Sequence, residues 1–410
     1  MEKLYLSLFC TLLCLLCSLS DSWSQAAPAV YLLKPSRVFD GETMHSGWVV
    51  LVRKDRIAGA GPAAGVKVPS EAKTIDLTGT TLMPGLIEAH SHVLLHPYNE
   101  ASWNDQNAHE SLALRVARAT VHLERTLMAG FTTIRDLGTE GAGYADVGLK
   151  QAVEQGIIPG PRMIVVTRAI VATGSYGPKG FAAEWTVPQG AEEASGNDVI
   201  RVVRDQIGHG ADWIKIYADY RWGLSNQAAP TFSEEEIRLM VETARSSGRA
   251  VAAHATTAEG MRRAAMSGVE TIEHGDNGTA DVFRLMKEKG VSYIPTLSVG
   301  GPNNERKRAV FQLALDSGVT IGSGSDVGVF PHGEEAREVE LLGAFGMPVL
   351  DALKAATSVD AKILHMDDRI GRVKEGLFAD VIAVDGDPST DLSRLHNVKL
   401  VMKNGAIYKQ

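Results

Sequence analysis

The chain has 410 residues, of which 44% are hydrophobic and 22% charged, and its formal net charge is −8. This length can bury one large core or two smaller ones, and the composition is ordinary for a globular protein. Because the sequence has no basic run and no basic aromatic stripe, nucleic acid is not an expected partner.

Residues 1–25 have the layout of a secretory signal peptide. Lys3 precedes an apolar, leucine-rich stretch from Leu4 to Leu19, and small and polar residues follow it. The stretch is shorter than the about 20 residues that a membrane span needs. We therefore expect cleavage near residues 24–27, no stable membrane span afterwards, and a secreted or periplasmic protein; an uncleaved anchor is the alternative. All three cysteines (Cys10, Cys14 and Cys17) lie in this segment, so the mature chain would form no disulfide.

The two flanks of the mature chain predict short strands. Residues 28–82 and 370–410 alternate apolar and polar positions between turns, and neither stretch is long enough for a good core of its own. We expect the two flanks to pair into one small β-sandwich domain.

Residues 83–369 repeat one pattern, in which a helical stretch ends in glycine and an apolar run of strand length follows. The predicted strands are 79–90, 131–134, 161–166, 211–217, 249–254, 269–274, 291–295 and 319–326. Strands that alternate with helices indicate parallel βα units. Eight units predict an α/β fold with a closed (β/α)8 TIM-like barrel, against the alternative of a doubly wound open sheet.

The segment His90-Ser91-His92 predicts a metal site. Side chains alternate along a strand, so the two imidazoles point the same way. Four further candidates, Lys215, His254, His274 and Asp326, each close an apolar run of strand length. Imidazole and carboxylate suit zinc and related ions, and the carboxyl ends of barrel strands meet at one face.

Several motifs resemble the amidohydrolase superfamily of metal-dependent hydrolases. They are the segments 83–92, 130–136, 212–215, 273–275, 323–326 and 376–380. The chain is similar to microbial dipeptidases that remove a C-terminal proline or basic residue, to ochratoxin-cleaving amidohydrolases and to imidazolonepropionase-like proteins. The resemblance implies His90, His92, Lys215, His254, His274 and Asp326 as metal ligands.

The resemblance further implies two divalent ions, with zinc expected, and a Lys215 carboxylated by carbon dioxide that bridges them. Such a centre would hydrolyse an amide bond of a small molecule, most simply of a dipeptide or an N-acyl amino acid. A metal-bridging hydroxide would attack the carbonyl, and Asp326 would carry the proton to the leaving nitrogen.

Substrate selection is expected in the loops that follow the strands. Tyr217 lies two residues after Lys215 on the same strand face, and Tyr176, Arg221 and His332 are further candidates for substrate binding. Arg221, Lys179 or Arg135 would suit a substrate carboxylate. Glu273, which alternates away from His274, is expected to be structural. We also expect a homo-oligomer.

Two alternatives remain at this point. A mononuclear deaminase or cyclic-amide hydrolase, related to imidazolonepropionase, would leave Lys215 unmodified and hold one ion. A catalytically silent binding protein on the same barrel is the alternative of another class, although the complete ligand set argues against it.

Overall fold

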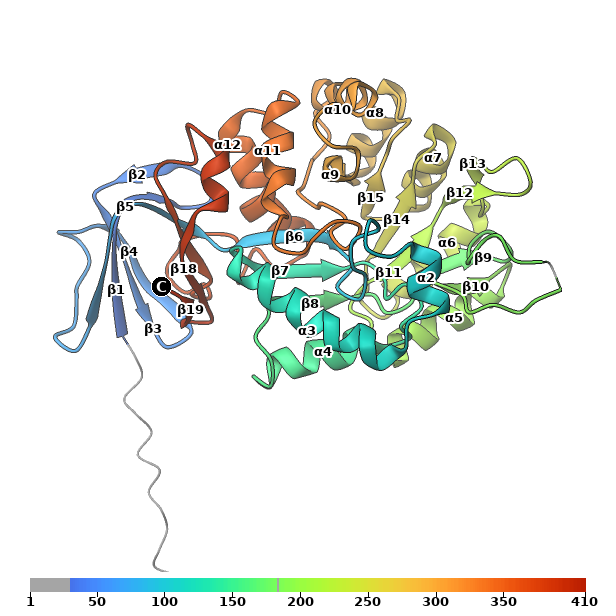
Figure 1. Ribbon diagram of the computed structural model, residues 1–410. Helices are drawn as coiled ribbons and strands as arrows, with labels where there is room; N and C mark the ends of the chain where they lie inside the picture. Colours follow the sequence, from blue (N-terminus) through green and yellow to red (C-terminus); the bar gives the residue numbers. More distant parts are fainter. Residues whose placement is uncertain (1–29, 183) are drawn as a thin grey trace, which may run out of the picture.

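The computed structural model describes residues 30–182 and 184–410, so the predicted signal peptide lies outside the described residues. Within those ranges, no helix is both long enough and apolar enough to cross a membrane. The described chain forms an α/β fold with a sheet of the flanking segments beside a larger body of parallel strands and helices (Figure 1).

Strands of the N- and C-terminal flanks lie in one sheet. Its order is β19-β18-β17-β5-β1-β3-β4, with β2 paired to β1. The flanks meet where β17 pairs antiparallel with β5, from Val381 opposite Pro84 to Asp385 opposite Thr80. The strands are β1 (Val30–Phe39), β2 (Met44–Ser46), β3 (Trp48–Arg53), β4 (Arg56–Pro62), β5 (Lys73–Pro84), β17 (Val381–Asp385), β18 (Val398–Lys403) and β19 (Ala406–Lys409).

The body contains two sets of parallel strands. One has the order β6-β7-β8 and the other the order β10-β9-β11-β14-β15-β16. Their strands are β6 (Leu86–Ser91), β7 (Phe131–Asp136), β8 (Arg162–Val165), β9 (Ile170–Ala172), β10 (Glu192–Ala194), β11 (Ile214–Tyr217), β14 (Val251–Ala255), β15 (Thr271–His274) and β16 (Ser292–Ile294). A separate antiparallel hairpin, β12 (Asp219–Trp222) with β13 (Gln227–Pro230), follows β11.

Hydrogen bonds join the ends of these two sets. The segment 319–327 makes parallel bridges from Ile321 to Tyr293 on β16 and from Val327 to Ser91 on β6. On the opposite side, the Val165 carbonyl of β8 accepts from the Asp212 amide at 2.8 Å, just before β11. The eighth predicted strand is thus an extended segment with isolated bridges instead of a regular strand.

The first predicted strand is divided into two. Residues 79–84 belong to β5 of the flanking sheet, and only β6 runs toward the histidines. Gly85 separates them, and a Cβ at this position would lie 2.1 Å from Thr132 Oγ1 on β7. Glycine therefore allows the chain to pass from one sheet to the other in close contact with β7.

Helices follow most of the parallel strands and lie outside them (Figure 1). Helix α6 begins after the N-cap Ser233, whose hydroxyl and Glu236 form a capping box. The helices are α2 (Trp103–Ala108), α3 (Leu112–Met128), α4 (Ala145–Glu154), α5 (Asp198–Gly208), α6 (Glu234–Arg245), α7 (Ala258–Ser267), α8 (Ala280–Lys289), α9 (Leu297–Gly300), α10 (Glu305–Ser317), α11 (Ala336–Ala344), α12 (Val349–Lys354) and α13 (Asp360–Ile363), with a π-helical turn at Ala355–Val359 and a 3-10 turn at Leu392–His396.

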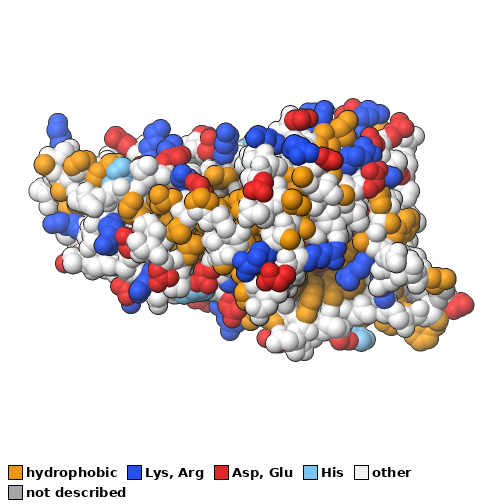
Figure 2. Space-filling model, turned by 90° about the horizontal axis from the view of Figure 1, so that it is seen from above, with side chains coloured by type: hydrophobic (Ala, Val, Ile, Leu, Met, Phe, Trp, Pro, Cys, Tyr) orange, Lys and Arg blue, Asp and Glu red, His pale blue; other side chains and the backbone are white. Residues whose placement is uncertain are grey.

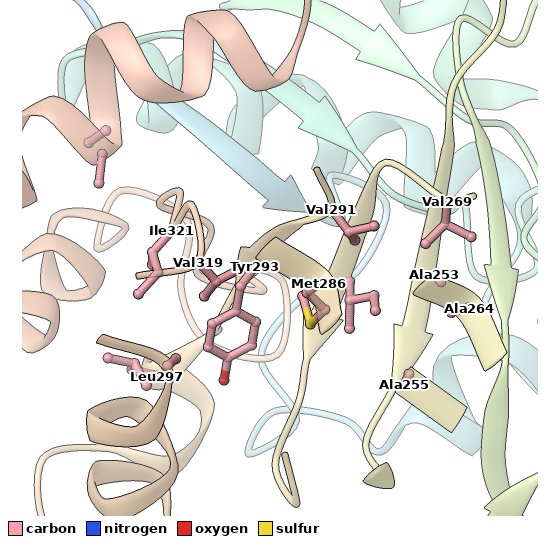
Figure 3. Packing of buried hydrophobic residues seen from close by; sticks show 14 of the residues in the cluster. Ala253, Ala255, Ala264, Val269, Met286, Val291, Tyr293, Leu297, Val319 and Ile321 are labelled. Atoms are coloured by element: carbon pink, nitrogen blue, oxygen red, sulfur yellow. The ribbon is translucent and has the colours of Figure 1, made fainter. Parts of the chain in front are cut away.

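The apolar core of the body lies between the strands and these helices. Figure 3 shows part of it, where Tyr293 and Val291 lie near Met286 of α8. The buried Tyr293 hydroxyl donates to the His274 carbonyl at 2.8 Å, so the core also holds the end of β15 in place. On the face shown in Figure 2, acidic and basic side chains are interspersed.

Candidate metal centre

The predicted ligands lie on different strands and point toward one region. His90 is on β6 and His92 directly follows that strand, while His254 lies on β14 and His274 ends β15. Asp326 follows the extended segment 319–325. Lys215 is the second residue of β11, and its side chain is buried.

Asp326 is the point at which the histidines meet. Its Oδ1 lies 3.3 Å from His92 Nε2 and 3.5 Å from His90 Nε2, and its Oδ2 lies 3.9 Å from His274 Nδ1. Ligand atoms of His90, His274 and Asp326 all lie within 4.8 Å of one another. His254 is placed beside this group by its ring, whose centroid is 4.6 Å from that of His274.

The backbone at the site is held in uncommon conformations. His274 and Asp326 have φ values of 73° and 63°, in the left-handed region that residues with a Cβ seldom adopt. The Asp326 amide donates to the His90 carbonyl at 2.8 Å. A Cβ on Gly324 would lie 2.8 Å from the His90 amide nitrogen, which shows how closely the eighth segment packs on β6. These contacts keep the strained residues in place.

Hydrogen bonds orient the imidazoles. His90 Nδ1 donates to Glu273 Oε2 at 2.8 Å, and His92 Nδ1 donates to the Gly138 carbonyl at 2.9 Å. His274 Nδ1 lies 2.9 Å from Thr296 Oγ1. Such partners on the second ring nitrogen are typical of histidines that bind a metal, because they set the ring's tautomer and direction.

Glu273, which was expected to be structural, directly contacts a predicted metal ligand. Its carboxylate joins His90 to the buried guanidinium of Arg135, whose Nη2 lies 3.0 Å from Glu273 Oε1. Burial opposes ionisation of Glu273, but Arg135 and His90 outweigh it and lower its pKa to about 2. Glu273 is therefore a positioning residue for His90, and Arg135 is tied to it and does not line the cavity above the ligands.

The pKa values of three histidines favour the neutral ring that metal binding requires. Burial, together with the Lys215 charge, lowers the pKa of His90 to about 4 and places that of His254 well below its usual value. Burial and the neighbouring His254 act in the same direction on the pKa of His274. Burial also lowers the pKa of His92, but its hydrogen bond to Asp326 prevails and raises it to about 9.

Lys215 is poised to lose its proton more easily than an ordinary lysine. Its residue is 1% exposed, and burial lowers its pKa to about 8 despite the opposing charges of Glu273 and Asp326. A fraction of neutral amine is therefore present near neutral pH.

This donor set fits a metal ion. His90 Nε2 is buried without a hydrogen-bond partner, although it faces Asp326 and lies among imidazoles. An unpaired polar atom of this kind is costly unless a ligand satisfies it. Imidazole nitrogens combined with a carboxylate are typical of zinc and related ions.

A cavity of about 470 Å³ opens above the ligands and contains most of the predicted substrate-binding residues. His92, His254, His274 and Asp326 line it, as do Tyr176, Tyr217 and Arg221. Tyr217 stacks on His254 with ring centroids 4.5 Å apart. Lys179 lines an outer lobe of about 320 Å³ that shares Tyr176 and Arg221 with this cavity.

His332 does not lie with the other candidates. It is 4% exposed, its ring stacks on His122 at 4.4 Å, and its Nε2 donates to the Leu95 carbonyl. It lines a different cavity, next to Arg125. The sequence could not indicate this, because the turn after Pro331 directs the side chain toward α3.

Five further residues line the cavity. Tyr98 and Tyr220 lie in the segments 96–100 and 217–222 after the first and fourth predicted strands, where substrate selection was expected. Glu140, Asp276 and Arg306 were not predicted, because no periodic pattern marks the direction of their side chains. The rule that loops after barrel strands form the site would have pointed to Glu140, which lies four residues beyond the end of β7.

The role of Glu273 leads to a first testable expectation. Glu273→Gln keeps the shape but removes the charge that holds His90 Nδ1 and Arg135, and loss of such a partner typically weakens metal binding about 10- to 100-fold. A competition titration with a chromophoric chelator measures the affinity. An affinity equal to that of the unchanged chain would contradict the positioning role.

Comparisons with known proteins agree with this site. A sequence model of the amidohydrolase family matches residues 81–408, and the chain belongs to that family. The ochratoxinase of Aspergillus niger is 30% identical over 380 residues, which cover 80% of this chain and 75% of the relative. Family membership supports a hydrolase of amide bonds, and members of the family generally bind divalent metals.

Two solved structures are similar over nearly the whole chain. A Xaa-Pro dipeptidase with methionine bound in its active site has a TM-score of 0.85 and 30% identity, covering 93% of this chain and all of that one. A prolidase in complex with N-methylphosphonate-L-proline has a TM-score of 0.82 and 28% identity, with the same coverage. These neighbours imply a TIM-barrel-like α/β fold.

Proposed function

We propose that this protein is a metal-dependent hydrolase that cleaves an amide bond in a dipeptide or an N-acyl amino acid. The observation that carries the proposal is the convergence of ligand atoms of His90, His274 and Asp326 within 4.8 Å of one another, with His274 and Asp326 lining the cavity. The similarity to an ochratoxinase and to prolidases supports the choice of an amide bond.

Bound divalent ions would polarise the amide carbonyl and lower the pKa of water toward about 7, which makes an attacking nucleophile available at neutral pH. His90, His92, His254, His274, Lys215 and Asp326 are the residues proposed to hold two such ions, most simply zinc. The neutral amine of Lys215 would add carbon dioxide and lose a proton, giving an anionic carbamate that has an oxygen for each ion.

Asp326 is the proposed proton carrier. Burial opposes its ionisation, but the adjacent imidazoles of His90, His92 and His274, of which His92 donates a hydrogen bond to it, hold its pKa well below the usual value, so it is a carboxylate at neutral pH. It lines the cavity and can take a proton from the attacking water and deliver it to the leaving nitrogen.

The far end of the substrate would lie toward Arg221. This residue on β12 lines both the cavity and its outer lobe. A guanidinium suits the carboxylate of a C-terminal amino acid. Tyr176 and Tyr217 would pack beside the amide, whereas Arg135 is held by Glu273 and is not available to substrate.

The proposed architecture is a closed (β/α)8 barrel over residues 83–369, with a β-sandwich formed by residues 28–82 and 370–410. The bridges of segment 319–327 to β16 and β6 support closure on one side, and the Val165–Asp212 hydrogen bond supports it on the other. The homo-oligomer and the absence of a nucleic-acid partner remain predictions.

A metal-quantified activity screen tests the proposed function. The purified chain is assayed on Xaa-Pro, Xaa-Lys, Xaa-Arg and N-acyl amino acids, before and after a chelator and after addition of zinc. We expect hydrolysis of at least one class, its loss with the chelator and its return with metal. No hydrolysis of any class by zinc-loaded protein would overturn the proposal.

The mononuclear alternative is a deaminase or cyclic-amide hydrolase. It is favoured by the compactness of the His90, His274 and Asp326 group, which alone suffices for one ion. Metal content distinguishes the two, since this alternative requires about one ion per chain and leaves Lys215 unmodified.

We also propose that residues 1–25 direct export. The leucine-rich stretch and the confinement of all cysteines to it support this proposal. Mass spectrometry of the protein from its native host should show an N-terminus near residues 25–28. A native chain that retains Met1 would contradict export by cleavage.

A further inference from the structure

Glu140 is a carboxylate buried in the cavity wall. The residue is 3% exposed. Its φ of 48° is a strained backbone conformation, and the side chain points inward. Its Oε2 accepts from Trp103 Nε1 at 2.8 Å and from the Tyr176 hydroxyl at 2.7 Å. Among the described residues, its Oε1 accepts a hydrogen bond from the Tyr217 hydroxyl alone, at 3.5 Å.

Within residues 30–182 and 184–410, no lysine, arginine or histidine forms an ion pair with Glu140. Arg115, whose charge acts on the same region, donates instead to the carbonyls of Leu94 and Thr139. A carboxylate that is desolvated in this way is costly unless a cation compensates it, and the open cavity beside Oε1 is the place for that cation.

Three tyrosine rings line the cavity with Glu140 and pack against one another. The ring centroids of Tyr176, Tyr217 and Tyr220 are 4.8–5.7 Å apart, and their planes cross at 54–69°. The face of an aromatic ring that borders a cavity attracts an ammonium group. A carboxylate beside aromatic rings thus favours an organic ammonium over a small hydrated ion.

This space lies beside the metal ligands. A Cβ built on Gly138 would lie 3.3 Å from Glu140 Oε1 and 3.7 Å from His92 Cε1, so the carboxylate and the ligand share a wall. On the other side, Tyr217 stacks on His254. A cation bound here would therefore be close to an amide carbonyl placed above the ligands. In a dipeptide, the α-ammonium is separated from the scissile carbonyl carbon by a single carbon atom.

We propose that Glu140, together with Tyr176, Tyr217 and Tyr220, binds the α-ammonium of the substrate's N-terminal residue. The inference rests on the proposed amide hydrolysis and narrows its substrate class. Dipeptides with a free N-terminus are then the preferred substrates, and N-acyl amino acids that lack the ammonium are poor ones. Glu140 acts on specificity and takes no part in the proton transfer assigned to Asp326.

A matched pair of substrates tests this role. Methionyl-proline is compared with its des-amino analogue, 4-(methylthio)butanoyl-proline, which differs only by the ammonium group. The unchanged chain should favour the dipeptide in kcat/KM by about 10- to 100-fold, the typical worth of a hydrogen bond to a charged group. Glu140→Gln should remove most of that preference by slowing the dipeptide alone, and Glu242→Gln on the exposed face of α6 should leave it unchanged.

The ratio of the kcat/KM values for the two substrates also distinguishes a specific effect from misfolding. A partly folded variant loses activity equally on both substrates, so its ratio does not change. An equal fold-change for both substrates, or no preference in the unchanged chain, would overturn the inference.

Calorimetry provides a readout that does not depend on turnover. Free methionine should bind more tightly than 4-(methylthio)butanoate, and Glu140→Gln should abolish the difference. If the chain hydrolyses no amide, the proposed function fails, yet the calorimetric comparison still decides whether Glu140 binds an ammonium. Equal affinities of the two ligands for the unchanged chain would overturn that role.

Discussion

Asp326→Asn should lower turnover by about 10²–10⁴-fold, the usual worth of a general acid–base group. Asparagine has nearly the same shape and keeps a carbonyl oxygen that faces His90 and His92, but it cannot carry a proton. The variant should therefore retain much of its metal, and kcat should fall on every amide that the unchanged chain hydrolyses. Steady-state kinetics combined with metal analysis of the same sample measures both effects.

The control for this experiment is Asp316→Asn, an exposed carboxylate on α10 that bonds to Gln312. Substitution of Glu273 or His122 would be an unsuitable control, because each of these side chains contacts another residue of the site or of the buried core. Glu273 orients His90, and His122 is buried and stacks on His332. Unchanged turnover of Asp326→Asn would show that the proton travels through a different group.

Lys215→Ala should lose metal and activity together, with a larger effect than removal of any orienting residue. Lys215 is buried among the ligands, and its pKa of about 8 makes the neutral amine accessible for reaction with carbon dioxide. Without the carbamate, the two proposed ions would lose the protein group that contributes an oxygen to each. Short carboxylic acids should restore part of both metal binding and turnover, because their two oxygens can replace those of the carbamate.

Lys362→Ala, an exposed residue of α13, is the matched control and should behave like the unchanged chain. A Lys215→Ala variant that keeps two ions and normal turnover would rule out the bridging role. A variant that keeps one ion and its activity would favour the mononuclear alternative.

Strand positions could be predicted from the sequence because apolar runs bounded by glycine are a local signal. Seven of the eight predicted runs correspond to β6, β7, β8, β11, β14, β15 and β16. The eighth run contacts β16 and β6 through one isolated bridge each, and the apolar pattern does not show that it forms no regular strand. The division at Gly85 was missed because the apolar pattern continues through it, and only contact with Thr132 shows the change of sheet.

The orienting residues of the site depend on contacts between distant segments. Alternation along β15 predicted that Glu273 points away from His274, yet Glu273 bonds to His90, whose ring centroid lies 5.0 Å from that of His274. His274 leaves the strand with a φ of 73°, and the contact of Glu273 with Arg135 of β7 joins segments distant in sequence. His332 lies outside the cavity above the metal ligands for a similar reason, since its ring stacks on His122 of α3. Glu140 was not predicted because it lies in a loop. The direction of its side chain depends on its own positive φ, which the sequence does not indicate.

Titration of activity with metal tests the central claim most directly. The chain is stripped of metal with a chelator, dialysed, and supplied with zinc in small steps while hydrolysis of methionyl-proline is followed. We predict that activity starts near zero and saturates at about two equivalents per chain, as a binuclear site requires. Full activity in the stripped chain would contradict a metal-dependent hydrolase, and saturation at one equivalent would contradict a binuclear one.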